Sequence, residues 1–298
     1  MLKKLVSILD VSYLLLIVLT YGLGISLSHY LGNPIRWSSF WNGILWLIGI
    51  VLSGFYFKEY FGKRSKSEFR RELLEEKYGD DSLQETNALK FCLLVGIAWL
   101  AVSLIPLINS VIEDRISALT LVFILLHLGF TYLVSIFPGY LSKTGLLEFI
   151  NAIILANLIP AIAFTLQSNG LHRLLLLLTF PLMFFFFALF IIITFQECER
   201  SEDTYLQSVV KSMGILKVVN LHNLLIVFGY LIMIMGVIFH VQWKLIWPQL
   251  MTLPIGAIQI WQISHVTKGG KPAISPLVLN AISTAGFTTY FLLLTLWL

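Results

Sequence analysis

TFPLMFFFFALFIIIT, residues 179–194, is the stretch that decides the fold, because it runs for more than four helical turns without a charge. It continues into FQECERSEDTYLQSVVKSMG, residues 195–214, which opens with a cluster of charges: Glu197, Glu199, Arg200, Glu202 and Asp203. A long uncharged run without alternation of polar and apolar residues predicts a membrane-crossing helix. The charges after it place the helix end at a membrane surface, either as solvated loop residues or as a site for a ligand that needs negative charge.

The composition of the chain extends this prediction to the whole protein. Of its 298 residues, 58% are hydrophobic and 12% are charged, with a mean hydropathy of +0.87, whereas soluble domains carry about 25% charged residues. Backbone groups in lipid are satisfied only in helices and closed barrels. We therefore predict an all-α membrane protein with one domain, 1–298. The nine predicted spans are 11–31, 39–57, 88–111, 117–137, 147–167, 174–195, 219–241, 245–263 and 277–297.

The distribution of Lys and Arg predicts the orientation. With the N-terminus in the cytoplasm, the outer connections hold only Arg36, Arg115, Arg173 and Lys244 of the twenty basic residues, and cytoplasmic loops are the ones enriched in Lys and Arg. The two lysines near the N-terminus precede a stretch too long for a cleaved signal peptide. This topology is typical of a bacterial inner (plasma) membrane protein.

Two of the predicted cytoplasmic connections are long, at about 58–87 and 196–218. In the first, residues 68–77 are rich in helix formers with opposite charges three to four residues apart, which favours a short surface helix. In the second, Tyr205, Val209 and Met213 recur at helical spacing and predict an amphipathic helix. Both loops are therefore candidates for a site at the membrane surface.

Polar residues inside the predicted spans are few, and each has two interpretations. His127, Asn151, Asn157, Gln259 and Gln262 form hydrogen bonds between helices, or they line a pocket. No charged residue lies at the centre of a span, which argues against a proton relay or a voltage sensor. No P-loop, HExxH or CxxC motif occurs, and we expect no nucleic-acid partner.

Two segments resemble motifs of a known family, the UbiA superfamily of intramembrane prenyltransferases. SIFPGYLSK, residues 135–143, is similar to a Tyr-Ser-x-Pro-Pro-x-x-Leu-Lys segment, in which Pro138 and Lys143 match while Ser135 and Gly139 differ. After the sixth span the family has Asp-x-x-x-Asp, and counting back from Met213–Gly214 places Glu197 and Ser201 at the two aspartates. The number of helices and the positions of the two long loops also resemble this family.

The family's other motif, Asn-Asp-x-x-Asp-x-x-x-Asp at the end of the second span, is matched less closely. Aligning Tyr60–Phe61 with the family's Tyr-Phe places Lys58 at the asparagine and Glu59 at the first aspartate. Gly62 and Lys66 then take the places of the other two aspartates. One carboxylate thus remains in each loop.

The resemblance implies a nine-helix UbiA-like bundle and a Mg²⁺-dependent transfer of an isoprenyl chain from a prenyl diphosphate to a lipophilic, membrane-soluble acceptor. It implies that Glu59 and Glu197 are the catalytic, metal-binding carboxylates. Glu199 and Asp203, which share a helical face at i, i+4, are further metal ligands if the loop register is shifted. The implied diphosphate-binding residues are Lys58, Lys63, Lys143 and Lys211.

Three functions stay open on the sequence alone. The chain is an active prenyltransferase, or a family member without catalysis that binds an isoprenoid or lipid or serves as a subunit of a membrane complex, or a transporter. Glu59 and Glu197 favour the first; Gly62, Lys66 and Ser201 favour the second. The basic run near Lys63 also fits simple anchoring to anionic lipid.

Overall fold

The computed structural model describes residues 11–74, 81–113, 116–200, 213–267 and 274–298, with side chains described at all of these except 11, 63–74, 81–87, 143, 198–200, 266–267 and 274. Within these ranges the chain is helical and contains no strand. The helices are α2 (Val11–Tyr30), α3 (Trp37–Leu74), α4 (Asp81–Ile112), α5 (Ala118–Ile136), α6 (Pro138–Thr144), α7 (Leu146–Ile153), the π-helical turn η1 (Ile154–Leu158), α8 (Ile159–Ser168), α9 (Arg173–Arg200), α11 (Ile215–Met235), α12 (Trp243–Leu250), α13 (Leu253–Thr267) and α14 (Ile274–Trp297).

In the described part of the chain, eight of the nine predicted spans coincide with helical segments that are long and apolar enough to cross a membrane. The span predicted at 245–263 is instead divided between α12 and α13, which meet at Met251–Thr252. Pro254 explains the division, since a proline is tolerated at the start of a helix but removes a hydrogen bond from the middle of one. The protein is thus an all-helical integral membrane protein with one broken segment, α12–α13, packed beside α11 and α14.

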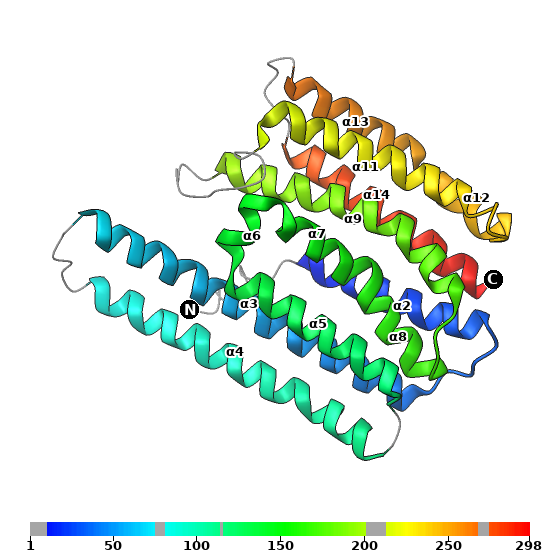
Figure 1. Cartoon of the computed structure of the whole chain (residues 1–298), viewed down its shortest axis with the longest axis horizontal. Helices are drawn as coiled ribbons and strands as arrows, with labels where there is room; N and C mark the ends of the chain where they lie inside the picture. The colour runs from blue at the N-terminus through cyan, green and yellow to red at the C-terminus, as the bar shows by residue number, and fades with distance from the viewer. Residues whose placement is uncertain (1–10, 75–80, 114–115, 201–212, 268–273) are drawn as a thin grey trace.

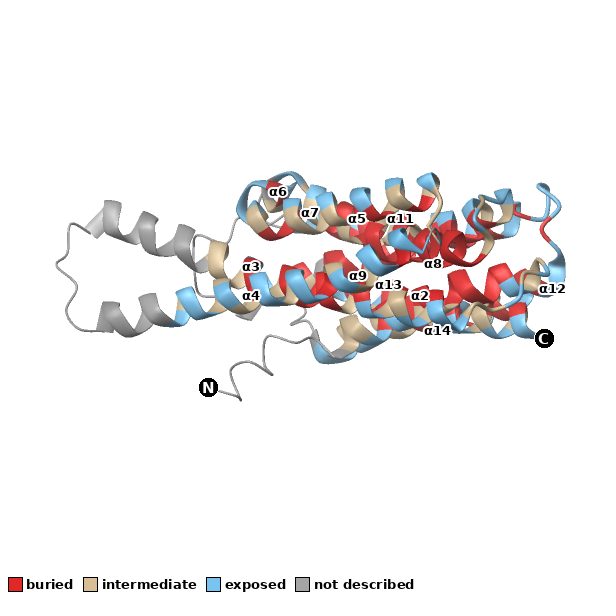
Figure 2. Ribbon diagram, turned by 90° about the horizontal axis from the view of Figure 1, so that it is seen from below, coloured by how far each residue is buried: buried red, intermediate tan, exposed pale blue. Residues whose placement is uncertain are grey.

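The helices are arranged around a central group formed by α2, α8 and α9 (Figure 1). α3, α4 and α5 lie on one side of this group, and α11 to α14 lie on the other. The span Leu146–Ser168 is 78% buried, whereas the span in α4 is 17% buried, so α4 is the outermost helix. Buried residues gather between the helices and exposed ones face outward (Figure 2).

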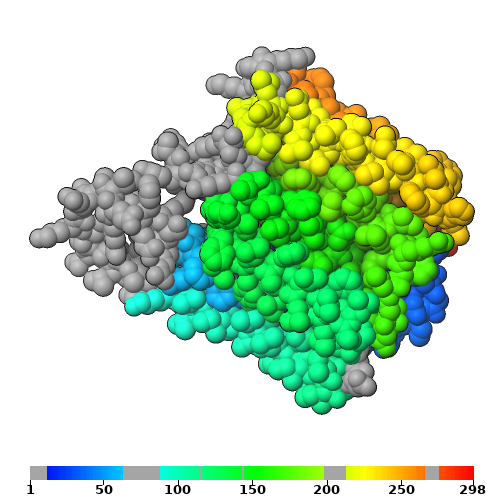
Figure 3. Space-filling model, viewed as in Figure 1, coloured from blue at the N-terminus to red at the C-terminus, as the bar shows by residue number. Residues whose placement is uncertain are grey.

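α3 and α4 continue past the predicted spans. α3 runs without a break to Leu74 and α4 begins at Asp81, so helix occupies most of the range predicted as the 58–87 loop. The short helix predicted at 68–77 is, as far as Leu74, the continuation of α3. In the space-filling view the green part of the chain lies between cyan α4 and yellow α11 (Figure 3).

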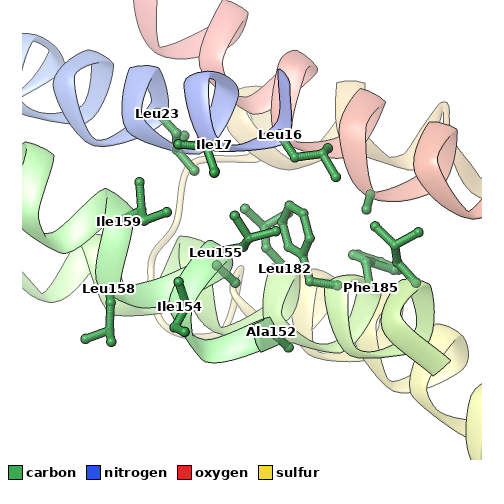
Figure 4. Close-up of a cluster of buried hydrophobic side chains, with 14 of the residues drawn as sticks. Leu16, Ile17, Leu23, Ala152, Ile154, Leu155, Leu158, Ile159, Leu182 and Phe185 are labelled. Carbon is green, nitrogen blue, oxygen red and sulfur yellow. The ribbon is translucent and has the colours of Figure 1, made fainter. Parts of the chain in front are cut away.

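A close approach between α2 and α8 builds the core. A Cβ added at Gly24 would lie 2.3 Å from the Pro160 carbonyl oxygen and 2.7 Å from Ala163 Cβ, so only glycine allows this contact. Pro160 has no N–H for the usual helical bond, and the π-helical turn η1 precedes it. Side chains from α2, η1, α8 and α9 meet in the resulting core (Figure 4).

The last helix closes the bundle by packing against the first. α14 lies beside α2, and the indole N–H of Trp297 donates to Ser26 Oγ at 2.6 Å. The ring of Trp297 also lies against His29, with centroids 4.8 Å apart. The C-terminal ends of α2 and α14 are thereby joined through side chains.

Candidate functional site

Glu148 lies where α7 begins, at the same end of the bundle as the end of α9 (Figure 1). α6 ends at Gly145, whose φ of 77° is a left-handed conformation that suits glycine, and α7 begins at the next residue. Glu148 therefore falls in the first turn of α7. Free backbone N–H groups and the helix dipole favour a negative charge in a first turn. The local structure thus accommodates a carboxylate here.

The carboxyl group of Glu148 is buried, but only one of its oxygens is hydrogen-bonded to a side chain. The residue is 1% exposed. The hydroxyl of Thr194 on α9 donates to Oε1 at 2.8 Å, whereas Oε2 is enclosed and has no hydrogen-bond partner among the residues that the structure describes. Leaving a buried polar group unpaired costs about 1–3 kcal/mol, and more for a charged one. Among the described residues, Oε2 is therefore an acceptor without a donor, although it is not accessible from the surface of the molecule.

Two charged side chains from other helices act on the same carboxyl group. Glu148 interacts electrostatically with the carboxylate of Glu197, which repels its charge, and with the ammonium of Lys58, which attracts it. Glu197 follows Thr194 by three residues on α9 and so lies on the same side of that helix. α3, α7 and α9 thus bring one basic and two acidic side chains to one end of the bundle.

Of the predicted site residues, the structure brings Lys58 and Glu197 together around Glu148. Both are exposed, and Glu59 is half-buried. Successive residues of a helix point about 100° apart, so Glu59 and Lys58 leave α3 in different directions. The prediction that Glu59 and Glu197 form the catalytic pair stays a prediction.

The other predicted residues carry no structural description at the level of side chains. Lys63, Lys143 and Glu199 lie on α3, α6 and α9, but their side chains are outside the described part. Asp203 and Lys211 lie outside the described residues, as does most of the amphipathic helix predicted around Val209. The Glu199–Asp203 metal pair and the four-lysine diphosphate site therefore stay predictions.

The residues around Glu148 have the chemistry of a Mg²⁺ site that is completed by a ligand. Within the described ranges, no three His, Cys, Asp or Glu side chains gather closely enough to hold an ion by themselves. Mg²⁺, however, usually binds through one or two carboxylates together with substrate phosphates and water. The unpaired Oε2 of Glu148, within electrostatic reach of Glu197, is compatible with that second pattern.

A small cavity lies far from these charges, between α9, α11 and α12. Its volume is about 10 Å³, and its walls are Leu177, Leu178, Pro181, Met233, Gly236, Val241, Ile246 and Gln249. This is space for about one water molecule. Leu177 is about 30 Å along α9 from Glu197, so the cavity is not part of the site at Glu148.

Most of the polar residues predicted inside spans form hydrogen bonds between helices. Gln259 of α13 contacts His222 Nε2 of α11 at 2.8 Å and accepts from Thr284 of α14 at 2.9 Å. Asn280 donates to Gln262 at 2.8 Å, and Thr179 donates to Asn157. The hydrogen-bonding interpretation is confirmed for these residues. His127 is an exception, because neither ring nitrogen has a partner.

Glu148 is the residue that sequence reasoning missed. The available signal was a single carboxylate in LLEFINAI, residues 146–153, at the start of a predicted span. No model of a known protein family matches this sequence, and a search of curated proteins also found no match. We therefore infer the function from the hydrogen bond between Thr194 and Glu148 and from the electrostatic effects of Lys58 and Glu197 on Glu148.

Proposed function

We propose that this protein is a UbiA-like intramembrane prenyltransferase, which transfers an isoprenyl chain from a prenyl diphosphate to a membrane-soluble acceptor. The observation that carries the proposal is the buried Glu148 carboxyl with its unpaired Oε2, which lies within electrostatic reach of Glu197 and Lys58. A diphosphate brings its own negative charge and needs cations around it. A site with two carboxylates to hold a metal ion and one ammonium to meet a phosphate suits such a ligand.

Each residue of the site has a separate task in this proposal. Thr194 holds Glu148 by its hydroxyl, and Glu148 and Glu197 supply oxygen ligands for a metal ion that arrives with the diphosphate. Lys58 meets a phosphate oxygen as a point charge. When bound, Mg²⁺ would stabilise the departing diphosphate as a Lewis acid. Glu59, Glu199 and Asp203 are proposed as additional ligands, with Lys63, Lys143 and Lys211 as further phosphate contacts.

The carboxylate of Glu197 supplies the first test of this function. We expect Glu197→Gln to weaken Mg²⁺-dependent binding of a prenyl diphosphate by about 10-fold or more, because it removes a metal ligand and keeps the side-chain shape. The measurement is calorimetric titration of geranylgeranyl diphosphate into purified protein, with Mg²⁺ and with EDTA. Glu113→Gln removes a carboxylate just after the end of α4, at the opposite end of the bundle, and serves as the matched control.

The same experiment can contradict the proposed prenyl transfer. The proposal is wrong if binding is unchanged by EDTA and by Glu197→Gln, or if the protein binds no prenyl diphosphate of any chain length. An equal loss in Glu113→Gln would show a general effect of charge and not a site at Glu197.

A second function, isoprenoid or lipid binding without transfer, is favoured by one observation. Lys58 attracts the charge of Glu148 electrostatically, so a positive charge is already present in the neighbourhood of this carboxyl group. An ammonium in that place binds a phosphate without any metal. Metal-independent binding without product formation would therefore support this second function.

For the membrane topology, we propose nine crossings with α12–α13 as the broken one and the N-terminus in the cytoplasm. An odd number of crossings puts the start of α2 and the end of α14 on opposite sides. The Lys and Arg distribution supports this orientation, and a bacterial inner membrane is the proposed location. The site at Glu148 then faces the cytoplasm, where prenyl diphosphates are soluble enough to reach it.

Single-cysteine labelling tests this orientation. In a background with Cys92 and Cys198 replaced by alanine, we expect Lys244→Cys to react with a membrane-impermeant maleimide in intact cells. Lys217→Cys, an equally exposed position at the other end of the bundle, should react only after lysis. The reverse pattern would place the N-terminus outside.

A further inference from the structure

Three buried polar groups between α3 and α5 have no hydrogen-bond partner. They are the indole N–H of Trp46, both ring nitrogens of His127 and the hydroxyl of Thr131. Trp46 is 2% exposed and His127 is fully buried. Their rings are in contact, with centroids 5.1 Å apart and planes tilted by 57°. Thr131 follows His127 by one helical turn on the same side of α5, where its methyl group faces Gly54 of α3. We call the side chains of Trp46, His127 and Thr131 the Trp46–His127 cluster.

The hydroxyl of Thr131 differs from its equivalents elsewhere in the bundle. Buried Ser and Thr hydroxyls in these helices donate to a carbonyl one turn earlier, as Thr20, Thr165 and Thr289 do, and this satisfies them locally. Thr131 makes no such bond. Unpaired buried groups are rare in folded proteins and commonly mark an unseen water, ion or functional contact. The cluster therefore calls for a partner from outside the chain.

The donors and acceptors of the cluster define the chemistry of that partner. The Trp46 indole only donates, a neutral His127 offers one donor and one acceptor, and Thr131 offers both. A partner must therefore accept and donate at once. A metal cation is excluded because the positive ends of the N–H groups would repel it. An anion is excluded because burying it near the centre of a membrane, without a basic residue as partner, costs free energy. We propose that the Trp46–His127 cluster binds a neutral hydroxyl group.

This site is separate from the proposed transfer reaction and does not depend on it. Trp46 precedes Lys58 by twelve residues on α3, which corresponds to about 18 Å along a helix. A hydroxyl held at Trp46 is too far from the diphosphate site to be the reacting group of an acceptor. The cluster is instead a second binding site at mid-depth of the bundle.

Two sources can supply the hydroxyl, a trapped water molecule or an alcohol dissolved in the membrane. α5 lies near the outside of the bundle, since only 28% of its span is buried. The membrane around α5 is therefore a source of alcohols, although His127 itself is fully buried. The same hydroxyl chemistry serves both sources, so the experiment must separate them.

The indole N–H of Trp46 reports directly on this hydroxyl. We expect a proton–nitrogen NMR spectrum of ¹⁵N-tryptophan protein to show the Trp46 indole proton shifted downfield, as in a hydrogen-bonded indole. Trp46→Phe assigns the signal by its disappearance. If Trp46→Phe does not fold, His127→Gln assigns the Trp46 signal instead, because only the indole in contact with residue 127 should change its shift. Glutamine keeps one donor and one acceptor at this position. His127→Leu, which keeps neither, should shift the signal upfield.

Two further measurements on the same sample identify the source of the hydroxyl group. A cross-peak between the indole proton and water identifies a trapped water. A shift on adding 1-dodecanol, and none on adding dodecane, identifies an alcohol. An indole proton at the position of an unbonded indole, unmoved by dodecanol and without a water cross-peak, would overturn the proposal.

Discussion

A protein carrying Glu148→Gln will bind a prenyl diphosphate with Mg²⁺ about 100-fold more weakly than the wild type, while its melting temperature stays the same or rises. The substitution keeps the size of the side chain and the Thr194 contact, but it removes a charge from a group that is 1% exposed and has an unbonded oxygen. That charge is costly in the empty protein. It also lies near the like charge of Glu197. Binding and stability should therefore change in opposite directions.

The loss of the electrostatic attraction between Glu148 and Lys58 does not reverse this expectation. Lys58 is exposed and stays hydrated when Glu148 is neutral, so no buried cation is left behind. Calorimetric titration measures binding, and thermal unfolding followed by fluorescence measures stability. Thr194→Val should weaken binding by about 10-fold, since it removes the hydroxyl that orients the carboxylate. A melting temperature that falls by several degrees in Glu148→Gln, with binding intact, would show that the role of Glu148 is structural only.

The second large effect is expected at the crossing of α2 and α8. Gly24→Ala should lower the free energy of unfolding by about 3 kcal/mol, because the added Cβ would lie 2.3 Å from the carbonyl oxygen of Pro160. That oxygen belongs to the backbone, which cannot move aside as a side chain does. The expected result is a large loss of monodisperse protein after mild heating, measured by size-exclusion chromatography.

Gly286→Ala is the matched control for this substitution. Gly286 also faces a neighbouring helix, but an added Cβ there would lie 3.5 Å from Leu16 Cδ2, an ordinary contact with a side chain. Alanine also favours helix over glycine, so this variant should be as stable as the wild type or more stable. Equal tolerance of both substitutions would mean that α2 and α8 are not in close contact.

The positions of most membrane-crossing helices could be predicted, because a long apolar segment is sufficient to identify each of them. The uncharged run at 179–194 lies within α9, and eight predicted segments coincide with apolar helices of the described chain. The division between α12 and α13 was missed because hydropathy measures how apolar a segment is, and not whether its backbone bonds continue past Pro254. The length of α3 was underestimated because the charged residues after Lys58 were interpreted as a loop, although their helix propensity extends α3 to Leu74.

The site could be predicted only in part. Glu197 and Lys58 were singled out by their place in the sequence, and both act on Glu148. Glu148 itself was missed because its importance comes from burial against α9, which depends on how separate helices pack. One carboxylate at the start of an apolar segment is also what a solvated helix end contains. His127 was singled out as a polar residue within a span, but its contact with Trp46 could not be predicted, because it depends on how α3 and α5 pack.

The contact between Trp297 and Ser26 has a consequence for how the protein is made. These residues are 271 positions apart in the chain, and a ribosome adds roughly 5–20 residues per second. α2 is therefore synthesised about 15–50 s before α14, the helix that covers one of its sides. During that interval the first helix has to be sheltered by lipid or by the insertion machinery. The contact between Trp297 and Ser26 forms only after α14 has left the ribosome.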